Sequence, residues 1–285
     1  MFFLNKDQYT CSDEFILSNP HTHTSYVDGK NTIREIIEIA ISQGMQSLGF
    51  SEHLEPPGSK YTLTPETAKH YCEEIRTLRK EYADRIRIWI GAERDSFSDA
   101  EYDIYEYWIA SVHHIKKGGQ LIKVLGKGED LYNNVQTIWN GDGLSYVQEY
   151  YDTFASYVET QHPHIIAHLD LIRKWNAHYH FFSEDDVTYQ CIVCSALERM
   201  ISSGALLEVN TGAMARGYLQ TPYPSLFALK KWKALGGQII IGSDCHDAKY
   251  LIYGFEEARQ LCHEAGYEYA WALGTNNTLF EQYKI

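Results

Sequence analysis

Histidine and aspartate side chains recur at close spacing in two polar segments of this 285-residue chain. The segment NPHTHTSYVDG contains His21, His23 and Asp28, and the segment GSDCH places Asp244 two residues before His246. Alternate residues of an extended segment point to the same side, so each pair can present two ligand atoms together. Imidazoles and carboxylates with few thiolates are typical ligands of divalent metal ions.

Seven short apolar runs are each followed by polar side chains that could act as such ligands or partners. We expect these runs to form strands over residues 15–19, 47–51, 86–92, 108–113, 164–169, 205–210 and 238–244. Their carboxyl ends carry, in chain order, His21 and His23, Glu52 and His53, Glu93 and Arg94, His113 and His114, His168 and Asp170, Glu208 and Asn210, and Asp244 and His246. A lone histidine is more often a packed or surface residue, but this recurrence at every strand end indicates one shared metal site. We expect His114 to point away from the site and to pack or cap.

Helical patterns follow most of the apolar runs. Thr32 and Glu35 form a capping box before an apolar stripe that is expected to end at Gly44. Further helices are expected from Thr64, over about 144–161, from Ser183 to about Gly204, from Pro224 to near Gly236, and once or twice at the end of the chain.

Strands that alternate with helices predict a parallel α/β sheet with the helices outside. A seven-stranded TIM-like barrel and an open doubly wound sheet both fit this alternation. In a barrel the carboxyl ends of the strands converge on one mouth, whereas an open sheet spreads them along an edge. The polar strand ends therefore favour a barrel, a single domain over 1–285 with a long polar connection over 116–143 after the fourth strand.

The composition excludes some classes of partner. A formal net charge of −13 argues against a nucleic-acid groove or an anionic membrane surface, although not against a small anionic substrate. We find no signal-peptide pattern and no apolar run near the roughly 18 residues of a membrane span. Cys191 and Cys194 form a CxxC, which we interpret as one face of a helix. We expect a reduced, cytoplasmic protein without nucleic-acid or membrane partners.

Together the motifs resemble the PHP (polymerase and histidinol phosphatase) family over almost the whole chain. The motifs that carry the resemblance are HTH (21–23), SEH (51–53), GAE (91–93), SVH (111–113), AHLD (167–170) and GSDCH (242–246). The segments EVNTGAMARG (208–217) and PYPS (222–225) resemble the histidinol-phosphate phosphatase branch of that family.

The resemblance implies a distorted (β/α)7 TIM-like barrel with two or three divalent ions (Mn, Zn or Fe) at the carboxyl ends of the strands. It implies a first ion held by His21, His23, Glu93 and Asp244, a second held by Glu93, His113 and His168, and a third held by His53, His246 and Asp28. Asp28 takes the place of a family histidine near Gly29, and Asn19 stands where relatives often have aspartate. We expect Asn19 to alter hydrogen bonds around the ligands more than ligation itself.

The resemblance also implies an activity. It is the metal-dependent hydrolysis of L-histidinol phosphate, a small phosphorylated amino alcohol, to L-histidinol and inorganic phosphate in histidine biosynthesis. A hydroxide shared by two ions across Glu93 would attack phosphorus, because a bound ion lowers the pKa of water towards roughly 7. Asp244 is the expected proton acceptor and His246 the expected donor to the leaving oxygen. Arg173 and Arg216 offer planar forks for phosphate, and candidates for the amine and imidazole are Glu55, Asp170, Glu208 and Tyr218.

Three other readings stay open. A PHP enzyme acting on nucleotides or nucleic-acid ends is disfavoured by the acidic composition and by the PYPS segment. An amidohydrolase would use a bridging lysine and a lone final aspartate, where this chain has Glu93 and an Asp-x-His pair. A non-catalytic metal-binding barrel would bind ions without turnover. The sequence leaves the oligomeric state, monomer or homo-oligomer, undetermined.

Overall fold

Ten strands form one mostly parallel sheet in the computed structural model, which describes residues 11–12 and 15–285. Along the sheet lie β2 (Ser18–Asn19), β3 (Ser47–Leu54), β4 (Arg87–Asp95), β5 (Tyr107–Ser111), β8 (Ile165–Ile166), β9 (Leu206–Asn210), β10 (Ile239–Gly242), β11 (Tyr269–Leu273), β12 (Phe280–Lys284) and β1 (Cys11–Ser12). Within this described sheet only β11 and β12 pair antiparallel. The predicted α/β class with a parallel sheet is confirmed.

The segments that follow the first and the last of the seven predicted strands lie side by side. Thr22, just after β2, forms a parallel bridge with Cys245, just after β10. The His23 amide donates to the Cys245 carbonyl at 2.8 Å, and the Cys245 amide donates to the His21 carbonyl at 3.1 Å. These bonds join the HxH and DxH segments directly. Because β2 and β10 are not paired as strands, a closed seven-stranded barrel stays a prediction.

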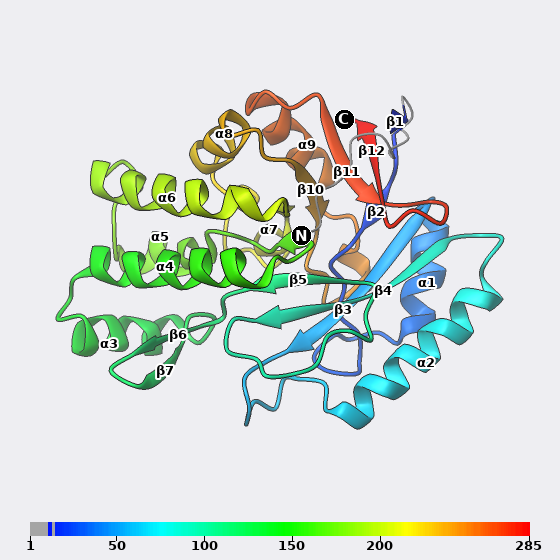
Figure 1. The fold of residues 1–285 in the computed structure, drawn as a ribbon, viewed down its shortest axis with the longest axis horizontal. Helices are drawn as coiled ribbons and strands as arrows, with labels where there is room; N and C mark the ends of the chain where they lie inside the picture. Colours follow the sequence, from blue (N-terminus) through cyan, green and yellow to red (C-terminus); the bar gives the residue numbers. More distant parts are fainter. Residues whose placement is uncertain (1–10, 13–14) are drawn as a thin grey trace.

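Helices lie outside the strands (Figure 1). Their bounds are α1 (Ile33–Ser42), α2 (Pro65–Glu81), α3 (Gly128–Ile138), α4 (Gly143–Gln161), α5 (Asn176–Tyr179), α6 (Val187–Met200), α7 (Gly212–Ala215), α8 (Leu226–Ala234) and α9 (Phe255–Glu264). The described residues also contain three 3-10 turns: η2 (Leu171–Trp175), η3 (Ile201–Ser203) and η4 (Ala248–Tyr250). None of the helices described is both long and apolar enough to cross a membrane.

Helix α1 shows how local sequence places an element. The predicted capping box is present: the Glu35 amide donates to Thr32 Oγ1 at 3.3 Å, and the Thr32 amide donates to Glu35 Oε2 at 2.9 Å. The predicted stripe turns inward, and its buried members are Ile33, Ile36, Ile37 and Ala40. This face packs with α2 against β3 and β4 (Figure 1), which sets the position of the strand that carries His53.

An apolar cluster fills the space between the strands. It is built mainly from strand residues, namely Trp89, Tyr107, Ile109, Ile165, Ala167, Leu206, Ile240, Trp271, Leu273 and Phe280. Tyr107 packs closely on Gly49 and Gly91, and its hydroxyl donates to the Pro20 carbonyl, immediately before His21. The cluster therefore supports the backbone of the HxH segment.

The connection predicted over 116–143 is more ordered than expected. It contains a hairpin, β6 (His114–Lys117) with β7 (Gln120–Lys123), and then α3. The hairpin forms because Ile115, Ile122 and Val124 are buried in the largest apolar cluster, together with α3 residues such as Leu131. In the sequence these few apolar residues stand between glycines and lysines, so the segment was predicted as a polar connection.

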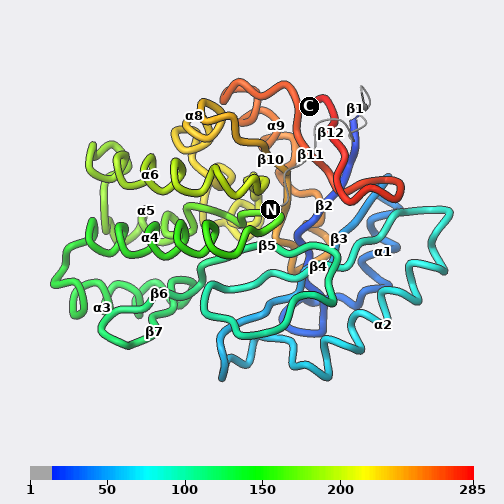
Figure 2. Tube along the Cα trace, viewed as in Figure 1, coloured from blue at the N-terminus to red at the C-terminus, as the bar shows by residue number. Residues whose placement is uncertain are grey.

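The end of the chain differs from prediction. One α-helix, α9, follows β10 in the described residues, as the predicted one or two allow, but the last segment is the β11–β12 hairpin, which was not predicted from the sequence. Its residues Ala270 to Leu273 are all buried, and Trp271 pairs with Ile240 of β10. Figure 2 shows the dark blue segment labelled β1 beside the red C-terminal segment, where β1 pairs with β12.

Two helix starts also differ from prediction. Asp186, not Ser183, caps α6 by accepting a hydrogen bond from the Thr188 amide. Ser225 caps α8, so that helix begins at Leu226, two residues after Pro224. In both cases a capping side chain lies directly before the first helical residue, and its hydrogen bond decides the start.

Candidate metal centre

The predicted ligands gather where the parallel strands end. His53 and Glu93 lie in β3 and β4, and the other seven follow β2, β5, β8 and β10. Seven of the nine side chains are buried, while Asp28 and His246 are half-buried at the edge. The order of the strands therefore brings residues that are far apart in the sequence, between positions 21 and 246, into one cluster.

Glu93 occupies the centre of this cluster. Its Oε1 lies 3.2 Å from His113 Nε2 and 3.1 Å from His168 Nε2. Its Oε2 lies 2.7 Å from His53 Nδ1 and 3.5 Å from His21 Nε2. Because the two carboxylate oxygens face different histidines, Glu93 has the geometry of a bridging ligand.

Asp244 closes the side of the cluster next to the HxH segment. Its Oδ1 lies 3.2 Å from His23 Nε2 and 3.7 Å from His21 Nε2. Its Oδ2 accepts a 2.6 Å hydrogen bond from Arg216 Nη2. The backbone at Asp244 has φ +47°, an uncommon left-handed conformation for a residue with a side chain. Such strain is concentrated at functional sites and here aims the carboxylate at the histidines.

Asp28 lies with the histidines of the predicted third site. Its Oδ2 is 3.7 Å from His53 Nε2 and 3.5 Å from His246 Nε2. Ligand atoms of His23, Asp28, His53 and His246 all lie within 4.8 Å of one another. His53 also groups with Glu93 and His113, so it stands between two of the predicted ion positions.

The donor set fits divalent cations. His21 Nε2, His23 Nε2 and Glu93 Oε2 are buried and, despite the charged neighbours described above, form no well-aligned hydrogen bond among the described residues. Buried polar atoms without partners are costly, and a cation between them would satisfy all three. Oxygen and imidazole nitrogen donors without a thiolate suit Zn, Mn or Fe.

Carboxylates close to His21 and His23 raise the pKa values of these histidines. Burial alone would lower the pKa of His21, but Glu208 and Glu93 raise that pKa well above its usual value. Burial opposes protonation of His23 too, yet Asp244 and Glu52 raise its pKa to about 10. The metal-free cluster therefore holds protons that an incoming ion must displace.

The positive groups around Glu93 and Asp244 lower the pKa values of these two carboxylates. Burial would raise the pKa of Glu93, but the charges of His113, His53 and His21 hold it well below its usual value. The pKa of Asp244 is also well below its usual value, because Arg216 and His246 outweigh the effect of burial. Both carboxylates are ionised, as ligation requires.

A second layer of carboxylates orients the imidazoles. His21 Nδ1 lies 2.8 Å from Glu208 Oε1, and His113 Nδ1 lies 2.6 Å from Glu55 Oε1. Such partners fix which ring nitrogen faces the ion. Glu208 is fully buried and also accepts from the His168 amide, so the structure places it beneath the ligands and not in the substrate space. The sequence had suggested Glu208 and Glu55 only for substrate.

Asn19 has a hydrogen-bond pattern that requires an amide. Its Nδ2 donates to Ser243 Oγ at 2.6 Å and to the Leu251 carbonyl at 3.0 Å. Its Oδ1 accepts from the His21 and Ser243 amides. An aspartate could not donate the first two bonds while ionised. Asn19 thus ties the HxH segment to the segment that carries Asp244.

The cluster opens into a cavity of about 390 Å³. Predicted ligands form its inner wall: Asp28, His53, His113, His168, Asp244 and His246. The rest of the lining is Glu55, Tyr61, Lys123, Leu125, Lys174 and Arg216. Arg216 is therefore placed where a phosphate oxygen could reach it. The sequence had not suggested Lys123 or Lys174, although Lys174 directly follows Arg173.

Three more predicted substrate residues, Arg173, Tyr218 and Asp170, do not line this cavity. Arg173 Nε bonds to Glu184 at 2.9 Å, and Arg173 Nη1 bonds to Asp170 at 3.4 Å. Arg173 lines a separate cavity of about 370 Å³. Tyr218 is partly exposed, and its ring centroid lies 4.3 Å from Lys174 Nζ. Asp170 is fully buried and also accepts from the Ser225 amide.

Two further neighbours of the ligands have structural contacts. Arg94 donates to Tyr157 Oη and to the Ser98 carbonyl, away from Glu93. His114 Nδ1 lies 3.4 Å from both Asp95 Oδ2 and Glu55 Oε2. His114 therefore contacts carboxylates of the second layer, whereas the sequence predicted that it would pack or cap.

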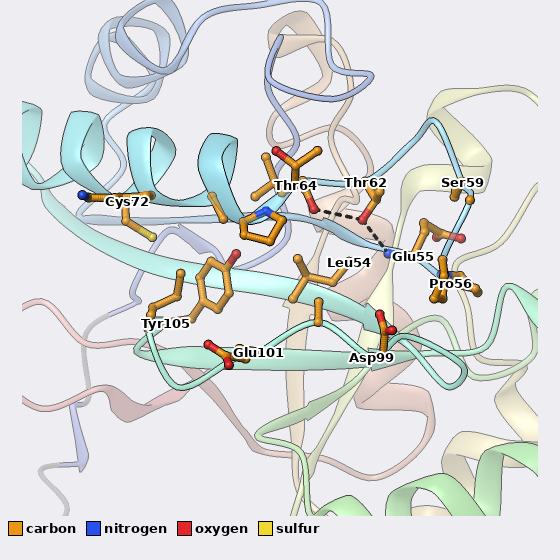
Figure 3. Close-up of a pocket in the computed structure, with 18 of the residues that line it drawn as sticks. Leu54, Glu55, Pro56, Ser59, Thr62, Thr64, Cys72, Asp99, Glu101 and Tyr105 are labelled. Atoms are coloured by element: carbon orange, nitrogen blue, oxygen red, sulfur yellow. Dashed lines mark hydrogen bonds between the residues drawn. The ribbon is translucent and has the colours of Figure 1, made fainter.

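A second cavity of about 780 Å³ adjoins the first, and Glu55 lines both (Figure 3). Figure 3 shows Leu54, Thr64, Cys72 and Tyr105 around it. The Thr62 hydroxyl accepts a 3.0 Å hydrogen bond from the Glu55 amide and fixes the wall between the cavities.

Comparisons with known proteins agree with this geometry. The PHP domain family model matches residues 19–212. A Schizosaccharomyces pombe protein named a probable histidinol-phosphatase is 24% identical over 273 residues, covering 88% of this chain and 87% of the relative. The histidinol-phosphatase of Bacillus subtilis is 24% identical over 265 residues, covering 85% and 98%. A solved structure of histidinol phosphate phosphatase from Lactococcus lactis, complexed with zinc, L-histidinol and phosphate, has a TM-score of 0.65 at 22% identity, covering 91% and 97%.

Proposed function

This chain belongs to the PHP domain family, and from that premise we propose that it hydrolyses L-histidinol phosphate to L-histidinol and inorganic phosphate. The observation that carries the proposal is the cluster around Glu93, which opens into a cavity sized for a small phosphate ester. Relatives that match most of this chain are named histidinol-phosphatases, which supports this substrate over others.

We propose that two or three divalent ions bind at the cluster. The residues that would hold them are His21, His23, Asp28, His53, Glu93, His113, His168, Asp244 and His246. Bound ions of this kind neutralise phosphoryl oxygens and make water acidic enough to supply a nucleophile. The bridge between Thr22 and Cys245 supports a distorted barrel, in which seven strand ends share this site.

The chain's own residues would then serve three tasks. Arg216 holds Asp244 Oδ2 in an ion pair and lines the cavity, so it positions that carboxylate and can donate a hydrogen bond to a phosphate oxygen. Asp244 Oδ1 faces the histidines and is our candidate proton acceptor. His246 lies at the cavity edge with Nε2 near Asp28, and in a centre of two ions, where it would not be a ligand, it is our candidate proton donor to the leaving oxygen.

Phosphate release tests this proposal. Protein reconstituted with Mn, Zn or Fe is assayed on L-histidinol phosphate, nucleoside monophosphates and oligonucleotides. We expect turnover on the first substrate only, and a fall of about 100-fold or more for His23→Ala and Glu93→Ala, because each removes a central ligand. Lys231→Gln, which breaks a surface pair with Glu198, is the control and should keep full activity.

Retained turnover in metal-replete His23→Ala would contradict the assigned centre. Preferred hydrolysis of nucleotides or oligonucleotides would instead favour the alternative PHP activity. Bound metal without turnover on any of these esters would favour a non-catalytic metal-binding protein.

A further inference from the structure

Two lysines on the outer wall of the 390 Å³ cavity have aromatic neighbours in place of carboxylates. Lys123 Nζ lies 5.1 Å from the Tyr61 ring centroid, and Lys174 Nζ lies 5.0 Å from the Trp175 and 4.3 Å from the Tyr218 ring centroids. Among the described residues neither ammonium forms an ion pair, whereas Lys30, Lys117, Lys231 and Lys249 all do. Aromatic faces hold an ammonium in place without neutralising it.

Backbone hydrogen bonds tie both lysines to segments that carry proposed ligands. The amide of Val124, next to Lys123, donates to the His113 carbonyl at 2.7 Å. The amide of Leu171, the first residue of η2, donates to the His168 carbonyl at 3.0 Å. Lys123 from the β7 strand and Lys174 from η2 are therefore anchored relative to the metal centre.

The cations on this wall repel one another. Burial, together with the charges of Arg216 and Lys123, lowers the pKa of Lys174 to about 8, although the charge of Asp244 opposes them. Arg216 is paired with Asp244, so the positive charge on this wall that no carboxylate neutralises belongs to Lys123 and Lys174. Divalent ions at the inner wall would increase the positive potential. An anion entering between the walls relieves this repulsion.

We propose that Lys123 and Lys174 form an anion subsite at the outer wall, which holds a phosphate dianion close to the metal centre. The proposal rests on the phosphatase function proposed above. A lysine binds phosphate as a compact point charge, and two of them on separate elements can contact different oxygens. The dianion is either the phosphate group of the ester on entry or inorganic phosphate before release.

Charge-removing variants of metal-reconstituted protein test this subsite. We measure KM and kcat for L-histidinol phosphate and the inhibition constant of inorganic phosphate for Lys123→Gln, Lys174→Gln and the double variant. Each single variant should raise KM, the phosphate inhibition constant or both by about tenfold, with kcat within about threefold. A rise in KM assigns the subsite to the ester, and a rise in the inhibition constant assigns it to released phosphate. Both results support the proposal.

Lys116→Gln is the matched control, because Lys116 is an exposed lysine of the same hairpin outside the cavity. It should leave all three constants unchanged, and Lys174→Arg should restore affinity because the charge is kept. Unchanged KM and phosphate inhibition in the double variant would overturn the proposal, as would a fall in kcat alone.

Phosphate binding separates this proposal from the proposed activity. Inorganic phosphate is titrated calorimetrically into the metal-loaded protein and into the double variant. If L-histidinol phosphate is not hydrolysed but phosphate binds about tenfold or more weakly to the variant, the activity is wrong and the subsite stands. Equal phosphate affinity of the two proteins overturns the subsite whatever the activity.

Discussion

At the scale of single residues, Glu93 illustrates how one side chain organises the centre. Its two oxygens contact different sets of histidines, and its own charge raises the pKa of several of them. The raised pKa values mean that protons occupy the imidazoles when no ion is bound. Metal loading must therefore be a proton-releasing reaction.

The pH dependence of metal binding follows from these shifts. His23 has its pKa raised to about 10, so it is protonated at neutral pH in the metal-free protein, and an ion needs its neutral form. Apparent affinity should therefore rise with pH, by about tenfold per pH unit for each proton released. Calorimetry in two buffers with different protonation enthalpies measures both quantities. Equal affinity at about pH 6 and pH 8 without proton release would contradict these protonation states.

At the scale of elements, the strands depend on close contacts in the interior. A Cβ at Gly91 would lie 2.3 Å from Tyr107 Cζ, and the Tyr107 ring is buried and held by its bond to Pro20. Alanine at this position must displace the ring from the cluster between the strands. The effect would reach the HxH segment, because Pro20 directly precedes His21.

Gly91→Ala should therefore lower the free energy of unfolding by about 1–3 kcal/mol, the usual cost of overpacking a core. Gly126→Ala is the matched control, since the nearest atom to its added Cβ is the Lys123 carbonyl oxygen at 3.8 Å. The control should change stability by less than about 0.5 kcal/mol. Urea unfolding of both variants measures the difference, and equal midpoints would show that Tyr107 moves without cost.

The hairpin β6–β7 is the element that most alters the site compared with expectation. It follows His113 immediately and brings Lys123 and Leu125 to the cavity. The sequence indicated only a long polar connection here. Its few apolar residues are buried in the core, and they fold the connection back over the metal centre.

At the scale of the whole molecule, the centre links segments from one end of the chain to the other. Ligands from residues 21 to 246 share contacts, and Asn19 joins the first segment to Ser243. Ions bound at this junction would hold several strand ends at once. Metal binding is therefore expected to stabilise the entire fold and not only a loop.

Thermal unfolding should reveal this coupling. A metal at about 100 times its dissociation constant adds about 2.7 kcal/mol of stability, which should raise Tm by about 5 °C. Differential scanning calorimetry of chelated and reloaded protein measures the shift. Glu93→Gln should lose most of it, whereas Lys231→Gln should show the full shift. The same Tm with and without metal in the unsubstituted protein would exclude strong binding at the cluster.

The sequence by itself determined the order of the strands that carry ligands, the α/β class and local features such as the capping box of α1. Those features depend on residue type and on spacing of a few positions, both of which are visible in the chain. The gathering of His21, Glu93 and Asp244 was also predictable, because parallel strand ends lie on one side of a sheet.

Only the tertiary structure decided which neighbours face the cavity. Arg173 and Lys174 are adjacent in η2, yet Arg173 pairs with Asp170 and Glu184 while Lys174 lines the cavity. Likewise Glu208 lies beneath His21 instead of facing substrate. Successive residues of a tight turn point in different directions, and their partners come from distant segments. Side-chain direction therefore depends on packing between elements, which spacing along the chain does not specify.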